Sequence, residues 1–329
     1  MKTTRTVVYR PIKLAVAILM IGGMTLAGSG IASASPGGVP GPPTWSHKGG
    51  QNGCGNAEIG VPTQSPAYYA AHPDEFAADP DMPAGMRAML DQIAQRQPTV
   101  LTSIACTPGP MRTRGVQNSG KSTLNWSGYW TGTTSTTYTF VSLDWTVPKV
   151  TSTSSTSDVT IWPGLGSGNS ASDALVQAGT AQLSTKTVFW YEIVPGQTQQ
   201  NTSISVAPGD SVSVAIGYNT STNVATYDFY DYTKNTFTAV TEKMLSGDKF
   251  GAKQAEWIVE RPTLSSGSYA LLPNFGTITT TSSGYGTSST TWMATNANPI
   301  TMVNSSNTTL AAPAWGTTHQ FTVTWKKAS

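Results

Sequence analysis

This sequence has few of the side chains that enzymes most often use in catalysis. Among 329 residues there are two cysteines and three histidines, and charged residues make up 11% of the chain, against about a quarter in an ordinary soluble domain. The formal net charge is +2. Phosphate binding needs clustered Lys and Arg, so no nucleic-acid partner is expected. Aromatic residues make up 9% of the chain, which argues against disorder.

Residues 121–329 lack what several common sites require. They contain no cysteine, which excludes a thiol nucleophile, and their one histidine is His319. A zinc site needs three or four ligands, and a Ser-His-Asp triad would have to use His319, which we interpret as a surface or packing residue. The sequence shows no dense acidic calcium loop and no glycine-rich phosphate loop. We expect no metal and no cofactor, so carboxylates and amides remain for chemistry.

The N-terminus is typical of an exported protein. Four basic residues come before residue 14, an apolar run spans residues 14–28, and Ala32-Ser33-Ala34 is a small-x-small cleavage site. A membrane anchor is the alternative, but the run is short for a span. We predict a signal peptide over residues 1–34 and a secreted, extracellular protein that makes no membrane contact after its removal.

The segment that follows has two parts. Residues 36–56 are rich in Pro and Gly and read as a linker. Within residues 81–96, methionine, leucine and isoleucine recur at helical spacing, with Asp81 as a candidate cap and Pro98 as a stop. The sequence predicts one short helix here.

Cys54 and Cys106 are the two cysteines of the chain, and they flank the predicted helix. In an exported chain a disulfide between them is expected. Two unpaired thiols are the alternative.

From about residue 121, strand-like runs alternate with clusters of Gly, Ser, Thr and Asn. This spacing predicts an all-β domain, an antiparallel β-sandwich. The chain then divides into a signal peptide (1–34), a partly helical intervening segment (35–120) and a β domain (121–329).

The run AEWIVE is unusual because it puts two carboxylates on an apolar strand. Alternation places Glu256, Ile258 and Glu260 on one face, while the residues between them face a core. Such a face must be wet or its carboxylates must be paired. The pattern alone leaves open an exposed strand face or a carboxylate held in a groove.

Three further polar residues stand out. Gln177, in DALVQAG, shares a strand face with apolar neighbours and must find hydrogen bonds if it is buried. It is a structural residue or, beside a carboxylate, a donor to an oxyanion. Asp228 and Asp231, in YDFYDY, are expected to face solvent.

The β domain resembles the glutamic peptidases, or eqolisins, which are secreted acid endopeptidases. The resemblance covers residues 121–282 and fades after about residue 283. It is carried by eight segments in order, NWSGYW, YTFVSLDWTVP, IWPGLG, LVQAG, FWYEIVP, ISVAPGDSVSV, AEWIVERP and LLPNFGTIT.

The resemblance implies two curved, packed sheets in a concanavalin-like sandwich, protein or peptide substrates, and a monomer. It places the catalytic glutamate at Glu260 and the catalytic glutamine at Gln177. Glu260 would activate a water as general base, Gln177 would donate to the oxyanion, and no covalent intermediate would form. Glu256 would support the site without touching the reacting atoms.

The resemblance implies that four further residues bind substrate: Trp162, Trp190, Tyr191 and Glu192. The alternative for the two tryptophans is that they are core residues.

The chain also departs from the family pattern. An Asp is often found where Gly166 stands and another before the W-Y-E element, where Val188 and Phe189 stand. These departures leave subsite specificity open.

In this light, residues 35–120 are expected to be a propeptide that covers the groove until acid loosens it. A stable extra domain held by the disulfide is the alternative.

Two other functions compete with the peptidase. A noncatalytic carbohydrate-binding β-sandwich would use exposed Trp and Tyr to stack on sugar rings. A glycosidase would use a pair of carboxylates among Glu192, Glu256 and Glu260.

Overall fold

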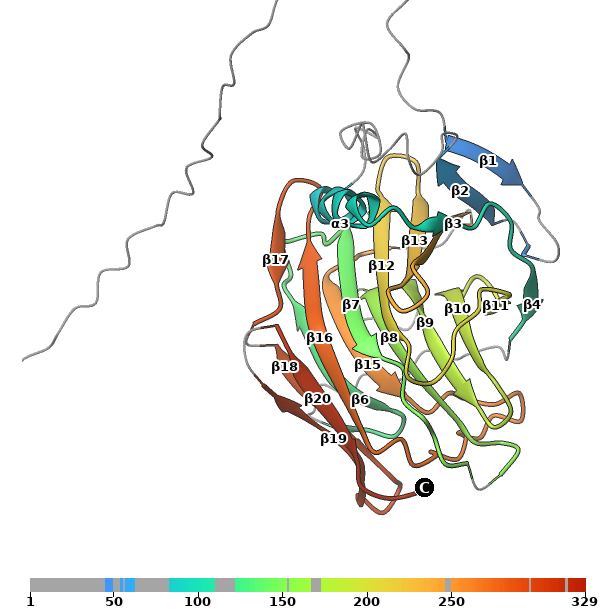
Figure 1. Ribbon diagram of the computed structural model, residues 1–329. Helices are drawn as coiled ribbons and strands as arrows, with labels where there is room; N and C mark the ends of the chain where they lie inside the picture. Colours follow the sequence, from blue (N-terminus) through green and yellow to red (C-terminus); the bar gives the residue numbers. More distant parts are fainter. Residues whose placement is uncertain are drawn as a thin grey trace, which may run out of the picture. The chain divides into compact units, whose positions relative to one another are not determined.

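Most of the chain is folded into two layers of antiparallel strands, shown in the computed structural model of Figure 1. All described residues belong to the unit Gly41–Ser329. Among them, no helix is long and apolar enough to cross a bilayer. The structure describes residues 45–49, 54–55, 57–62, 83–109, 122–152, 154–166, 173–245, 250–295, 297–316 and 319–329. The predicted signal peptide lies outside these residues.

The first layer, sheet A, is antiparallel except where β3 runs parallel to β14. Its strands, in spatial order from one edge, are β1 (Trp45–Gly49), β2 (Glu58–Pro62), β14 (Thr236–Lys243), β13 (Val224–Asp231), β12 (Ser211–Asn219), β7 (Phe140–Thr146), β16 (Thr277–Gly286) and β17 (Thr291–Met293), with β3 (Thr99–Val100) also on β14.

The second layer, sheet B, carries the segments that the sequence singled out for chemistry. Its strands, again in spatial order, are β4 (Cys106–Pro108), β11 (Gln200–Thr202), β10 (Thr187–Val194), β9 (Leu175–Leu183), β8 (Asp158–Gly166), β15 (Gln254–Glu260), β6 (Trp126–Gly132) and β18 (Asn298–Val303).

The C-terminal strands connect the two layers at one side. β19 (Thr309–Trp315) pairs with β18 and with β20 (Phe321–Trp325), β20 pairs with β16, and β5 (Ser122–Thr123) runs parallel to β18. His319 lies in the turn between β19 and β20 with a positive φ of 59°.

The largest apolar cluster fills the space between the sheets, as expected for a sandwich. Trp145 and Val214 come from sheet A, and Trp257, Val176 and Phe189 come from sheet B. The alternation predicted for AEWIVE is confirmed, because its odd-numbered residues lie in this core. The antiparallel β-sandwich predicted from the sequence is therefore the fold of the protein.

Each sheet also has a buried outer face. Helix α3 (Ala84–Gln95) packs across β7 and β12 of sheet A (Figure 1), with Met86, Leu90 and Ile93 buried. The predicted helix is confirmed, but Pro83 rather than Asp81 is its N-cap residue. On sheet B the outer apolar cluster is rich in tryptophan and lies where the candidate site residues project.

The segment before residue 121 is built into both sheets. β2 and β3 pair with β14 of sheet A, whereas β4 pairs with β11 of sheet B. The segment expected to be a linker also contains a strand, β1, which pairs with β2. Where it has been described, this segment extends the sheets and covers the outer face of sheet A. The division of the chain at residue 121 stays a prediction.

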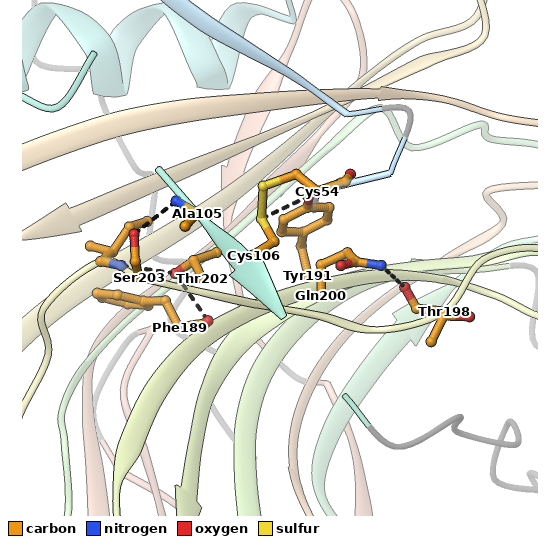
Figure 2. Close-up of a disulfide and its surroundings, with 10 residues drawn as sticks. Cys54, Ala105, Cys106, Phe189, Tyr191, Thr198, Gln200, Thr202 and Ser203 are labelled. Atoms are coloured by element: carbon orange, nitrogen blue, oxygen red, sulfur yellow. Dashed lines mark hydrogen bonds between the residues drawn. A yellow bond between two sulfur atoms is a disulfide. The ribbon is translucent and has the colours of Figure 1, made fainter. Parts of the chain in front are cut away.

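A disulfide joins Cys54 to Cys106, as predicted. Figure 2 shows the bond above Tyr191, whose hydroxyl lies 3.6 Å from Cys106 Sγ and 3.5 Å from the carbonyl of Cys54. Ser203 accepts a hydrogen bond from the Ala105 amide. The disulfide thus ties the segment before β4 to the core beneath β10.

Several carboxyl groups are buried in this fold. Burial raises the pKa of Glu242 to about 8, and this side chain lies close enough to Tyr191 and Tyr227 for its charge to raise their pKa values further. Burial also raises the pKa of Asp144, against hydrogen bonds from Ser213 and Tyr232 that lower it.

The expectation that Asp228 and Asp231 face solvent is wrong, since each is 1% exposed. Asp231 points toward Lys234, which bonds its Oδ2 at 2.9 Å and also contacts Asp210. Asp228 lies on the face of sheet A that α3 covers, beside Ala215 and Ala239. Helix α3, which comes from far upstream in the sequence, covers the face of sheet A on which Asp228 lies.

Candidate active site

The outer face of sheet B gathers the residues that the sequence proposed for chemistry. Alternate residues of a strand share a face, and residues that pair across neighbouring strands share it too. We call this surface the site face; its members are Trp126, Trp130, Trp162, Gln177, Trp190, Glu192, Glu256, Ile258 and Glu260.

Glu260 ends strand β15 and is 2% exposed. Each of its carboxylate oxygens accepts a hydrogen bond from a neutral side chain. Asn125 Nδ2 donates to Oε1 at 3.1 Å, and Trp162 Nε1 donates to Oε2 at 3.0 Å. Donors of this kind stabilise the ionised carboxylate and fix its plane.

Gln177 lies in the middle of strand β9 and is 3% exposed. Its Nε2 donates to Oε2 of Glu192, on the next strand, at 3.0 Å. Its carbonyl Oε1 has no hydrogen-bond partner within the described part of the chain. One N–H of the amide is thus engaged in orienting it, which leaves a second N–H for another acceptor.

The register of the strands decides which side chains lie in line. Glu192, Gln177, Gly164 and Glu256 are paired across four successive strands and form one row. Glu260 lies in another row, four residues farther along β15, opposite Thr160. Gln177 and Glu260 therefore share the site face, but Glu256 is the carboxylate in the row of Gln177.

Trp162 occupies the space between these two rows. One edge of its indole donates to Glu260, while its other edge lies beside Gly164, so that a Cβ on Gly164 would come within 2.7 Å of the ring. The indole also makes an edge-to-face contact with Trp126, with ring centroids 5.2 Å apart. A side chain at position 164 would displace this ring.

The four residues expected to bind substrate fall on different faces. Trp162, Trp190 and Glu192 lie on the site face and are at most 1% exposed. Tyr191 lies on the opposite face of β10, in the core between the sheets, because successive residues of a strand alternate. Its hydroxyl contacts the disulfide region, and its role in substrate binding stays a prediction.

Glu256, expected to support the site, is fully buried and pairs in register with Trp130 on one side and Gly164 on the other. Asn125 is the site residue that the sequence reasoning missed. The NW pair that opens β6 was recognised as part of the family pattern, but nothing local in the sequence indicates that its amide reaches a carboxylate 135 residues away.

Comparison with known proteins identifies the family of this chain. Residues 124–325 match the Peptidase A4 family. The match continues past residue 283, so the expectation that the resemblance fades there is wrong; the strands up to β20 belong to it. No curated protein matches the sequence.

Two solved structures with similar folds are glutamic peptidases. Scytalido-glutamic peptidase with a transition-state analogue inhibitor is 17% identical, with a TM-score of 0.54, over 61% of this chain and 98% of that one. SCP-B, described as a member of the eqolisin family in complex with the tripeptide Ala-Ile-His, is 16% identical, with a TM-score of 0.52, over the same shares of the two chains.

The resemblance to glutamic peptidases is thereby confirmed at the level of family and fold. The chain belongs to the Peptidase A4 family and is a peptide-bond hydrolase of the glutamic peptidase type.

Proposed function

We propose that this protein is an exported acid endopeptidase in which Glu260 is the general base and Gln177 binds the oxyanion. The observation that carries the proposal is the pair of neutral N–H donors on Glu260, one to each oxygen. Donors of this kind favour the ionised form of a carboxylate and fix its orientation. A base with these properties remains usable in acid.

The proposed reaction needs no covalent intermediate. Glu260 takes a proton from a water molecule while the oxygen of that water attacks the carbonyl carbon of the scissile peptide bond. The carbonyl oxygen gains the negative charge and accepts a hydrogen bond from the second N–H of Gln177, whose first N–H is held by Glu192. Protonated Glu260 then gives its proton to the leaving amine as the C–N bond breaks.

The substrate is proposed to lie along the site face, with its scissile carbonyl over Trp162. This indole separates the rows of Gln177 and Glu260, so a carbonyl above it has the base on one side and the amide on the other. Because Trp162 and Trp190 are buried, extended peptide has to contact them by local movement of the residues that cover them.

Working in acid is further supported by the buried carboxyl groups. Burial raises the pKa of Glu242, Asp144 and Asp228. Each of these groups keeps its proton when folded at a pH at which the unfolded chain has released it. Their contribution to stability is therefore fully present below the ordinary carboxyl range and is lost as the pH rises through the raised values. This balance favours the fold in acid.

The test is proteolysis of an unfolded protein substrate at about pH 3 to 5, followed by mass spectrometry of the products. We expect internal cleavage that falls away toward neutral pH, with no sensitivity to chelators or thiol reagents. A protein that cleaves nothing across this range, or that instead hydrolyses polysaccharide, would refute the proposal. Competing glycosidase chemistry requires two carboxylates across a sugar, but in the row of Glu256 and Glu192 the Gln177 amide and Gly164 stand between them.

A further inference from the structure

Asn125 lies in the turn between β5 and β6 and is 2% exposed. Its side-chain amide reaches the catalytic candidate Glu260 and donates to Oε1 at 3.1 Å. A second donor to this carboxylate, Trp162, comes from the neighbouring strand β8. Glu260 is thus held from two sides, once by its own sheet and once by a turn.

The turn is fixed on both sides of Asn125. Before it, the hydroxyl of Thr123 accepts the backbone N–H of Trp126 at 2.8 Å and donates to the Trp126 carbonyl at 3.1 Å. Across from it, Arg261 donates its backbone N–H to the Asn125 carbonyl at 3.0 Å. The Arg261 side chain donates through Nε to the Leu124 carbonyl at 2.8 Å.

Arg261 follows Glu260 directly in the sequence. Two neighbouring residues therefore carry the carboxylate and the groups that hold the turn of its donor, Asn125. Arg261 is 7% exposed. Its guanidinium lies over the ring of Tyr269, with its Cζ atom 4.9 Å from the ring centroid. Desolvation lowers the pKa of Arg261. A buried cation gains little stability by itself, but the planar guanidinium donates in a fixed geometry.

We propose that Asn125 is a positioning residue for the Glu260 general base, and that Arg261 holds the turn that presents it; the proposal rests on the proposed function. The Asn125 amide donates to one oxygen of the Glu260 carboxylate. This hydrogen bond favours the ionised form of Glu260 and fixes the direction of its remaining lone pairs. Removing it makes protonation of Glu260 easier and its orientation looser.

The test compares the pH dependence of kcat and KM in wild type and Asn125→Ala. We expect kcat to fall at least tenfold near the acid limb of the profile, KM to change less than about threefold, and the acid limb to move upward by roughly one pH unit. Asn125→Asp, which puts a second carboxylate beside Glu260, should move it farther. Arg261→Ala should act in the same direction as Asn125→Ala, with a smaller shift.

Asn219→Ala is the matched control, because it removes an amide that caps the β12–β13 turn through Ser221 and Thr222. It should leave the pH profile unchanged. An unchanged acid limb in a folded, active Asn125→Ala protein overturns the positioning role while the peptidase stands. A carbon-13 titration of the Glu260 carboxyl tests the same role without activity: the signal must titrate at higher pH in Asn125→Ala, and an equal midpoint overturns the proposal.

A second, independent observation concerns the carboxyl group beneath helix α3. Along β12, Gly217 lies against Met86 of α3 and Ser213 lies 3.9 Å from the Met89 sulfur. Ala215, between them, pairs in register with Asp228. The Asp228 carboxyl is therefore on the face that α3 crosses, 1% exposed, and neither of its oxygens has a hydrogen-bond partner in the described residues.

Other groups that titrate or carry charge lie on the elements packed around this face. Asp144 of β7 is bonded by Ser213 and Tyr232, and Tyr230 donates to Asn235, which in turn bonds the carbonyls at the end of α3. Among the described residues, the elements around this face carry Asp144 on β7, Tyr230 and Tyr232 on or after β13, Lys243 on β14, Glu58 on β2, and Arg87, Asp91 and Arg96 on or after α3.

A carboxylate without partners cannot stay ionised in such a place at low cost. Burial alone raises the pKa of Asp228 well above its ordinary value of 3.8. With α3 docked, the group holds its proton; with α3 displaced, water reaches it and it ionises in the ordinary range. Docking is therefore strongest below about pH 4 and weakens as the pH rises toward the raised value.

We infer that α3 is a proton-linked strap, which docks on sheet A while Asp228 is neutral and loosens as Asp228 ionises. The direction is opposite to that of a propeptide that acid loosens. Acid holds this strap in place, and rising pH frees it. Because α3 lies on sheet A and the site face is on sheet B, the strap does not depend on the catalytic proposal.

The test is hydrogen–deuterium exchange of the α3 amides in the full chain at about pH 4 and pH 7, corrected for intrinsic exchange. In wild type, protection should fall at least tenfold at pH 7, since each pH unit between the two pKa values changes the docking equilibrium by up to tenfold. In Asp228→Asn the two pH values should agree within about threefold. Asp91→Asn, with the same charge change on the helix itself, should behave like wild type.

Wild-type protection that does not change with pH overturns the inference, whatever the variants do. So does a loss of the pH dependence in Asp91→Asn with its retention in Asp228→Asn. Thermal unfolding at about pH 4, where the carboxyl and the amide are both neutral, should give similar Tm values for wild type and Asp228→Asn, which shows that the variant is folded.

Discussion

Replacing Glu260 with glutamine is expected to lower kcat about 10²- to 10⁴-fold, the range attributed to general acid–base catalysis. The substitution keeps the length and shape of the side chain, and its amide oxygen can still accept the hydrogen bond from Asn125 or Trp162. It cannot take a proton from water or return one to the leaving amine. KM should change much less, since the substrate-facing surface is preserved.

The measurement is steady-state cleavage of a fluorogenic peptide at the acid optimum, with Tm recorded to confirm folding. Glu256→Gln is the matched control, because Glu256 is also buried, on the same strand and on the same face. It should keep more than about a tenth of the wild-type kcat. If Glu256→Gln were the inactive protein and Glu260→Gln the active one, the base would be the carboxylate that lies in the row of Gln177, and the assignment made from the family pattern would be reversed.

Gln177→Leu is expected to lower kcat about 10²- to 10³-fold, as loss of one oxyanion donor does in other enzymes. The reason is specific to the transition state. The carbonyl oxygen carries full charge only after water has attacked, so the missing N–H matters little for binding the ground state. Glu192 also loses the hydrogen bond from Gln177, which adds a cost in stability of about 1 to 3 kcal/mol.

Gln182→Leu provides the control for that stability cost. Gln182 is a buried glutamine on the same strand, five residues on, and its amide donates to Thr180 rather than to a site residue. Its removal should lower Tm but leave kcat within about threefold. Equal kcat losses in the two variants would mean that Gln177 stabilises the structure of the strand and does not stabilise the transition state.

The sequence supplied the strands and the faces of sheet B because both depend on local alternation. The orientation of Glu256, Ile258 and Glu260 followed from a period of two alone, and the core on the other side of β15 is where that pattern requires it. The Cys54–Cys106 bond followed from there being two cysteines in a chain predicted to be exported. These inferences needed no knowledge of which strands are neighbours.

What could not be predicted depends on contacts between distant segments. Asp228 was expected to face solvent, and only the packing of α3 on sheet A shows that its face is covered. Asn125 carries no local sign of its contact with Glu260, which arises from the pairing of β6 with β15. The separation of Glu260 and Gln177 into different rows depends on the register in which β15, β8 and β9 pair, and local sequence patterns do not reveal this register.

The disulfide also bears on the border of sheet B formed by β4. Cys106 begins β4, a strand of three residues that ends in proline and pairs with the equally short β11 next to β10. Short, proline-bearing edge strands offer little backbone for another chain to add to. The disulfide to Cys54 holds β4 at this edge, so that the longer and more apolar strands of sheet B do not form it. Reduction of the disulfide is therefore expected to expose backbone that other chains could pair with and so to promote aggregation.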